Sequence, residues 1–241
     1  MRDLGRIVAH IPARAGSKRV RSKNLRLLNG KPLLAYSVEC AKACPEFDEI
    51  YVNSDSDDML ALAAKLGAKT YQRSSELASD TATGDQFTAD FIEHMGPDTL
   101  VMINPVCPLI EPVDVSAAIQ TFQLSDCDTL ITCEASRMQT FCRGEPVNIS
   151  LDGQLAPTQE NPEVTILNWA VTVWDAAKFM ENYANTGSAY IGKQRVLMPI
   201  DPIKSLKISN EQDFRLAECL LYGLSVLRAS TEQIDYWSPS K

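Results

Sequence analysis

Short apolar runs alternate with amphipathic segments along the first part of the chain. Residues 7–11, 49–54 and 68–72 have the length and the β-branched content of strands. Between them, apolar residues recur at helical spacing over residues 33–44 and 59–66. This strand–helix–strand order predicts an α/β fold with a doubly wound, mostly parallel sheet.

The alternation continues toward the end of the chain. We expect the first helix to open at Lys31 and Pro32, because proline is favoured at a first helical position. The other predicted elements are strands at 99–103, 129–133, 167–174, 195–200 and 205–208, and helices at 87–94, 113–124, 175–183 and 210–224. Together they predict a single domain over residues 1–229, followed by a loosely held tail at 230–241.

Residues 135–166 do not follow this pattern. Their periodicity fades, and prolines and glycines separate short apolar pieces. One interpretation is a long surface loop, although structureless loops beyond about 15 residues are uncommon in compact domains. The interpretation that we prefer is an excursion of extended segments outside the main sheet.

Composition excludes several classes of protein. A hydrophobic content of 45% is enough for a sizeable core, but no apolar run approaches the roughly 20 residues of a membrane span. The seven cysteines form no CxxC pair, which predicts reduced thiols in the cytoplasm, and two histidines are too few for a His-rich metal site. A net charge of -8 argues against general nucleic-acid binding.

Basic residues gather in one interval of this acidic chain. No Asp or Glu lies between Asp3 and Glu39, whereas Lys and Arg are frequent there. The loop at 13–19, directly after the first predicted strand, mixes these cations with small residues. Gly16 could adopt a positive φ and has no side chain to block a ligand. The loop could be an ordinary solvated basic segment. Its place at the end of a strand favours a polyphosphate-binding loop, although both common nucleotide fingerprints are absent.

Three motifs carry a resemblance to a known family. IPARAGSKRVRSKNL, RSSELASDTA and NPVCPL resemble the first three motifs of the CMP-sugar-acid synthetases, also called acylneuraminate cytidylyltransferases. The resemblance implies a Rossmann-like nucleotidyltransferase fold. It also implies transfer of CMP from CTP to a sialic-acid-like (nonulosonic) sugar acid, with release of pyrophosphate. In this family the region corresponding to residues 135–166 is an arm that joins two subunits, which implies a homodimer.

The resemblance also implies roles for individual residues. Arg14 and Lys23 match the phosphate-binding and catalytic cations of the first motif. Asn104 and Asn168 are the candidates for the sugar acid. The nucleotide-binding set as a whole is Arg14, Lys23, Asn24, Arg73, Ala82 and Gly84.

The chain departs from the family at the metal site. Mg²⁺ is expected from the family, but Lys207 and Ser209 replace the two aspartates that usually hold it. Lys207 could supply one positive charge in place of the metal, or it could point to solvent while Asp201 or Glu211 holds the ion. These replacements keep an alternative open, namely a nucleotide- or sugar-binding homologue without transferase activity that serves as a regulator or partner subunit.

Overall fold

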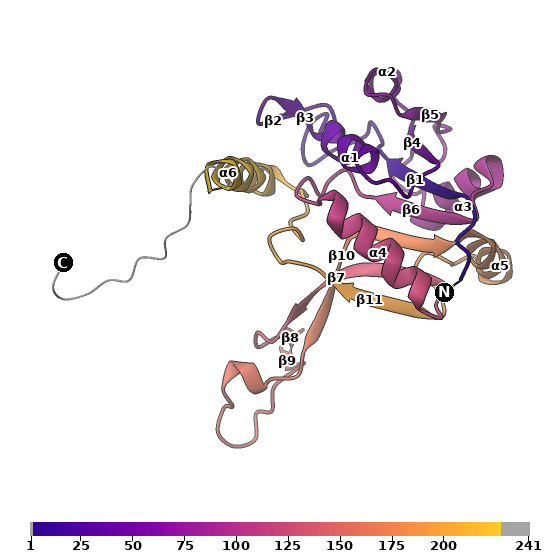
Figure 1. The fold of residues 1–241 in the computed structure, drawn as a ribbon. Helices are drawn as coiled ribbons and strands as arrows, with labels where there is room; N and C mark the ends of the chain where they lie inside the picture. Colours follow the sequence, from indigo (N-terminus) through magenta and orange to yellow (C-terminus); the bar gives the residue numbers. More distant parts are fainter. Residues whose placement is uncertain (1, 228–241) are drawn as a thin grey trace.

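A seven-stranded sheet forms the centre of the protein, whose residues 2–227 are described by a computed structural model (Figure 1). Its strand order is β11-β7-β10-β6-β1-β4-β5, and only β10 runs antiparallel to its neighbours. The strands are β1 (Ile7–Pro12), β4 (Glu49–Ser54), β5 (Lys69–Gln72), β6 (Thr99–Ile103), β7 (Thr129–Ser136), β10 (Val164–Asp175) and β11 (Arg195–Pro199). The predicted fold class is thereby confirmed.

Helices cover both faces of this sheet. They are α1 (Leu33–Lys42), α2 (Asp57–Lys65), α3 (Gly84–Met95), α4 (Pro112–Leu124), α5 (Ala176–Thr186) and α6 (Glu211–Leu227). α1, α2 and α4 share one core with Val101 of β6, whereas α3 and α5 share another with Leu100. Two cores exist because successive side chains of a strand point to opposite faces. α6 packs beside the sheet through Phe214 and Ala217, in a third cluster.

Two local predictions are wrong. Lys31 and Pro32 form the short strand β3 (Lys31–Pro32), paired with β2 (Leu27–Leu28), so the helix begins only at Leu33. The segment 205–208 is not a strand. It is held instead by a hydrogen bond to the turn after β6, from Ile208 N to Val106 O at 2.8 Å, and by the Ile208 side chain, which is buried in the third cluster with α6.

The excursion predicted at 135–166 projects away from the sheet (Figure 1). β7 and β10 both run beyond their predicted ends and pair as far as Ser136 and Val164. Between them lie β8 (Phe141–Cys142), β9 (Glu145–Pro146) and the 3₁₀ turn Thr158–Glu160. This segment has extended pieces and one short pairing of its own.

A bulge interrupts β10 where it leaves the main sheet. The register with β7 shifts between Leu167 and Thr172, and Trp169 within this interval has a φ of 59°. A left-handed backbone is unfavourable for a bulky residue, so the surrounding contacts must hold it. Trp169 stacks at a tilt on Tyr190, with ring centroids 5.1 Å apart.

The predicted tail at 230–241 lies outside the described residues. Within residues 2–227, no helix is long and apolar enough to cross a membrane.

Candidate functional site

The predicted site residues follow strands whose carboxyl ends meet at one edge of the sheet. The basic loop, residues 13–26 between β1 and β2, follows β1, while Arg73 follows β5 and Asn104 follows β6. β1, β4, β5 and β6 are parallel to one another, so their carboxyl ends lie together. In open α/β sheets this edge is where ligands bind.

The basic loop and the turn after β6 enclose a pocket of about 390 Å³. Four of the predicted residues line it: Arg14, Lys23, Asn24 and Asn104. The sequence placed them at separate positions, and the fold brings them to one cavity.

Gly16 also lines this pocket, but its backbone is not left-handed. Its φ is not among the positive values, and a Cβ added there would meet nothing within 4 Å. The left-handed residue of the loop is Ser22, with a φ of 48°. Gly16 therefore needs no unusual backbone, and its lack of a side chain leaves space in the lining of the pocket.

Lys23 lies in a strongly positive part of this pocket. Burial lowers the pKa of its ammonium group, and nearby Arg19, Lys207 and Arg14 lower that pKa further. Its Nζ donates to Ile208 O at 2.9 Å, and no salt bridge to it forms within residues 2–227. A cation that repels its cationic neighbours and pairs with no carboxylate favours the binding of a polyanion such as a triphosphate.

Asn24 brings an unused hydrogen-bond acceptor to the same place. The residue is only 4% exposed, and its Oδ1 has no partner in the described part of the chain. Its Nδ2 reaches the Arg14 carbonyl at 3.4 Å. Buried polar atoms are rarely left unpaired, so this oxygen suits a ligand that donates a hydrogen bond.

The loop after β5 packs against the basic loop. Arg14 Nη1 donates to Ser79 O and to Asp80 Oδ1, both at 3.1 Å, and Lys18 forms an ion pair with Asp80. Ala82 lies half-buried just beyond these contacts, before the helix cap at Thr83. The loop after β5 therefore lies against the basic loop beside the pocket, but Arg73 and Ala82 do not line that pocket.

Arg73 begins this second loop and is almost fully buried. Burial lowers the pKa of its guanidinium to about 10. Its Nε donates to Asn53 Oδ1 at 2.7 Å, its Nη2 donates to Asn53 O at 3.1 Å, and its Cζ lies 4.3 Å from the centre of the Phe87 ring.

Gly84 has a packing role at the first turn of α3. A Cβ there would lie 2.8 Å from the ring of Tyr190, so a larger residue would displace that ring. Gly84 does not line the pocket that holds Arg14 and Lys23.

The two candidates for the sugar acid have different surroundings. Asn104 lines the pocket, and its Nδ2 donates to Trp169 O at 3.1 Å. The Asn168 amide is buried, and both of its ends are occupied. Its Oδ1 accepts from Thr132 Oγ1 at 2.7 Å and its Nδ2 donates to Ser205 Oγ at 2.9 Å. The fold therefore brings Asn104 to the cavity and places Asn168 inside the bulge of β10.

The region of Lys207 does not have the donor set of a magnesium site. Lys207 is exposed, and its charge acts on Lys23 and Cys107. Asp213 accepts from Ser209 N and Asn210 N at 2.7 and 3.0 Å, and Glu211 is bound to Arg26. Among residues 2–227, no three His, Cys, Asp or Glu side chains gather as metal ligands.

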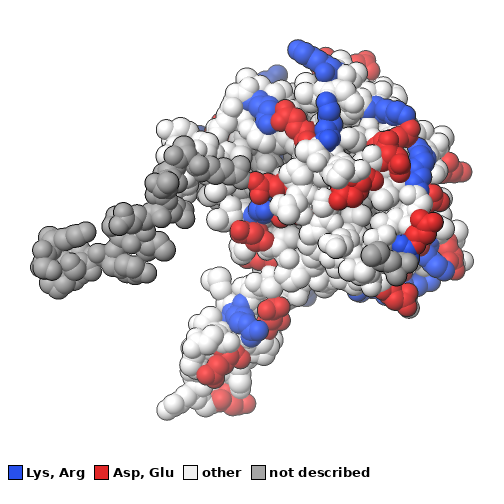
Figure 2. Space-filling view, in the orientation of Figure 1, with Lys and Arg blue, Asp and Glu red and all other residues white. Residues whose placement is uncertain are grey.

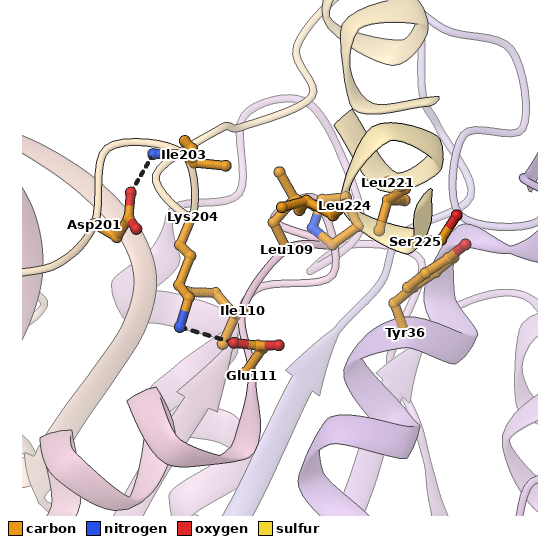
Figure 3. A pocket seen from close by; sticks show the side chains of 11 residues that line it. Tyr36, Leu109, Ile110, Glu111, Asp201, Ile203, Lys204, Leu221, Leu224 and Ser225 are labelled. Atoms are coloured by element: carbon orange, nitrogen blue, oxygen red, sulfur yellow. Dashed lines mark hydrogen bonds and ion pairs between the residues drawn. The ribbon is translucent and has the colours of Figure 1, made fainter. Parts of the chain in front are cut away.

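A second, larger pocket of about 480 Å³ lies between α1, α6 and the turn after β6 (Figure 3). Leu109, Ile110, Leu221 and Leu224 give it apolar walls. At one end, Lys204 is bound to Glu111 at 2.9 Å. Its lysine is already paired with acids, so this pocket is poorly suited to a triphosphate.

The sequence reasoning missed one part of the site. Asn53 is hydrogen-bonded to Arg73, and His10 is hydrogen-bonded to Asn53. Neither residue was a candidate from the sequence. The available signal was a histidine within the apolar run of the first strand, at a position where an aliphatic residue is usual.

Comparisons with known proteins agree with this arrangement. A family model described as cytidylyltransferase matches residues 8–212. The chain is 29% identical to the CMP-N,N'-diacetyllegionaminic acid synthase of Legionella pneumophila, over 90% of this chain and 96% of that protein. It is 27% identical to the post-translational flagellin modification protein B of Campylobacter coli, with the same coverage.

A solved structure shares the fold. The CMP:2-keto-3-deoxy-manno-octonic acid synthetase, solved in complex with CTP, aligns with a TM-score of 0.69 over 91% of this chain and 99% of its own. The sequence identity is 16%, so this likeness concerns the fold alone.

Proposed function

Because this chain belongs to the cytidylyltransferase family, we propose that it transfers CMP from CTP to a sialic-acid-like sugar acid and releases pyrophosphate. The observation that carries the proposal is the pocket in which Arg14, Lys23 and Asn24 meet beside the loop after β5. The choice of a nonulosonic acid as acceptor rests on relatives named as synthases of CMP-legionaminic acid.

The proposed reaction is an in-line displacement at the α-phosphorus of CTP. A hydroxyl of the sugar acid attacks and loses its proton, a new P–O bond forms, and the bond to the β-phosphate breaks. Negative charge then accumulates on the leaving pyrophosphate. Arg14 and Lys23 would stabilise this charge, and positioning with electrostatics supplies most of the catalysis in such transfers.

The nucleoside and the sugar acid would lie at neighbouring parts of the site. Asn24, Arg73 and Ala82 are the proposed contacts of the nucleoside, while Gly84 would act by keeping the first turn of α3 close to Tyr190. Asn104 is the proposed direct contact of the sugar acid, since it lines the pocket. Asn168 would act on the acceptor through the bulge that it holds in place.

Magnesium chemistry would have to differ from the family pattern. When bound, Mg²⁺ neutralises phosphate charge, but the carboxylates near Lys207 are engaged with backbone N–H groups or with Arg26. Lys23 and Lys207 would place fixed positive charge at this end of the pocket. In the family, aspartates at the positions of Lys207 and Ser209 hold magnesium. We propose that in this protein any magnesium enters with CTP instead.

The first prediction is selective use of CTP. With Mg²⁺ and a panel of nonulosonic acids, CTP should release pyrophosphate, whereas ATP and GTP should bind more weakly by calorimetry. Arg14→Ala should weaken CTP binding by about 1.5–3 kcal/mol, because it removes a charge-assisted phosphate contact, and should weaken cytidine binding less. If CTP binds but releases no pyrophosphate with any acceptor, the protein is the homologue that lacks transferase activity. Equal affinity for all nucleotides would exclude a base-reading loop.

The second prediction is a homodimer joined through residues 135–166. The excursion exposes several large apolar side chains, namely Met138, Phe141, Val147, Leu151 and Leu155. In Figure 2 white atoms cover much of this projecting segment. A symmetric exchange of two such segments would bury apolar surface that is otherwise exposed.

Light scattering measures this assembly. The intact chain should have twice the monomer mass at micromolar concentration, and deletion of residues 138–162 should halve it. A monomeric intact chain, or a deletion that leaves the mass unchanged, would contradict the proposed dimer.

A cytoplasmic location accords with the cysteines, all of which are free thiols.

A further inference from the structure

His10 is a buried polar residue at the centre of an apolar strand. Its side chain is fully buried between the sheet and α3, and it stacks on Phe91 with ring centroids 4.4 Å apart. Burial, and then the charge of Arg73, lower the pKa of His10 well below its usual value, so the ring is neutral. The neighbouring positions Val8, Ala9 and Ile11 are aliphatic, and an aliphatic residue at position 10 would avoid the cost of a buried imidazole.

A chain of hydrogen bonds gives this histidine a defined orientation. A guanidinium can only donate, so the Asn53 atom that faces Arg73 Nε at 2.7 Å is its carbonyl oxygen. The amide nitrogen of Asn53 therefore faces His10 Nε2 at 3.0 Å and donates to it. The proton of His10 must then lie on Nδ1, which has no partner within residues 2–227. The Nδ1–H group of His10 is therefore left unpaired, while Nε2 accepts the hydrogen bond from Asn53.

The far end of this chain is Arg73. Besides its two bonds to Asn53, it is fixed by the face of Phe87 and by its backbone N–H, which donates to Ser54 O at 2.8 Å. Within the described residues, only its Nη1 makes no hydrogen bond. The guanidinium is thus held in one orientation, with one nitrogen left for a ligand.

We propose that His10 and Asn53 are positioning residues for base recognition, in which the His10 acceptor orients the Asn53 amide and Asn53 orients Arg73 toward the pyrimidine of CTP. This inference rests on the proposed function, because it needs CTP as the ligand. It assigns a role to two residues that would not themselves touch the nucleotide. The effect should fall on binding of the base and not on binding of the phosphates.

The test compares two ligands by calorimetry, CTP and inorganic tripolyphosphate. His10→Phe keeps a ring beside Phe91 but removes the acceptor, and it should raise the Kd of CTP about tenfold while the Kd of tripolyphosphate is unchanged. His10→Gln can present a carbonyl oxygen to Asn53 and should remain close to wild type. Thr172→Val is the matched control, because Thr172 is fully buried with an unpaired Oγ1 and lies outside this chain of bonds.

The outcomes separate this inference from the proposed function. If the wild-type protein does not bind CTP, the proposed function is wrong. If it binds CTP and His10→Phe binds CTP equally well, or if the variant weakens both ligands equally, His10 is only a packing residue and the inference is wrong.

One measurement does not depend on any variant folding. Nitrogen NMR of the two histidines should show His10 neutral, with its proton on Nδ1. A proton on Nε2 would mean that the Asn53 amide faces the other way, and that result would overturn the inference.

Discussion

Lys23→Ala is expected to lower kcat/KM for CMP transfer by about 10²–10³-fold, the usual effect of removing a group that stabilises transition-state charge. Lys23 is partly buried in the pocket and, unlike Arg14, pairs with no carboxylate among residues 2–227. It is therefore poised for charge that develops on the departing pyrophosphate. Steady-state assays of pyrophosphate release measure the change, and circular dichroism checks that the variant is folded.

Substitutions of Lys207, the exposed cation near Lys23, provide a comparison in which a smaller effect is expected. Lys207 is exposed, so Lys207→Ala should weaken CTP binding less than Lys23→Ala. Lys207→Asp should make the reaction more dependent on magnesium, because a carboxylate can hold the ion and an ammonium group cannot. If Lys23→Ala retains wild-type kcat/KM, the pocket is not the site of transfer. If Lys207→Ala changes neither CTP affinity nor the magnesium response, Lys207 is a surface residue.

Trp174→Ala is expected to lower the free energy of unfolding by about 3–5 kcal/mol, as large-to-small changes in a core usually do. Trp174 is fully buried in β10. Its ring lies edge-on to that of Phe179, with the ring centroids 5.7 Å apart. Its Nε1 donates to Tyr190 O at 3.0 Å, so the indole also anchors the loop that packs on Gly84. The substitution would leave a cavity beneath α5 and release this loop.

Urea unfolding measures the loss, and Trp174→Phe is the control. Phenylalanine keeps most of the apolar contact but loses the hydrogen bond to Tyr190, so less than half of the loss is expected. A loss below about 1 kcal/mol for Trp174→Ala would mean that the core closes over the cavity, contrary to this description.

The central architecture could be predicted because its signals are local. The fully apolar run at Thr99–Ile103 is a strand buried on both faces, as periodicity and length indicate. The family resemblance, read from three motifs, is confirmed by the cytidylyltransferase match over residues 8–212. The pocket that unites Arg14, Lys23, Asn24 and Asn104 agrees with that resemblance.

The features that the sequence did not predict depend on contacts between residues far apart in the chain. His10, Asn53 and Arg73 come from three different segments, and no spacing in the sequence connects them. Strand β10 begins earlier than predicted because its pairing partner β7 also continues beyond the sheet. The segment 205–208 has the alternation of a strand, but its apolar side chains Leu206 and Ile208 pack in the third cluster with α6 instead of on the sheet.

The bulge in β10 lies between the excursion and the candidate site, so it connects the two. On one side of it, Thr172 is bound within the sheet to both β6 and β7; on the other side, Val164 pairs with β7 alone and leads into the excursion. Asn168 lies at this junction, and Trp169 O binds the side chain of Asn104 at the pocket. A displacement of the excursion would therefore move the Trp169 carbonyl that holds Asn104 at the pocket, and in the proposed dimer this would couple the contact between subunits to the shape of the site.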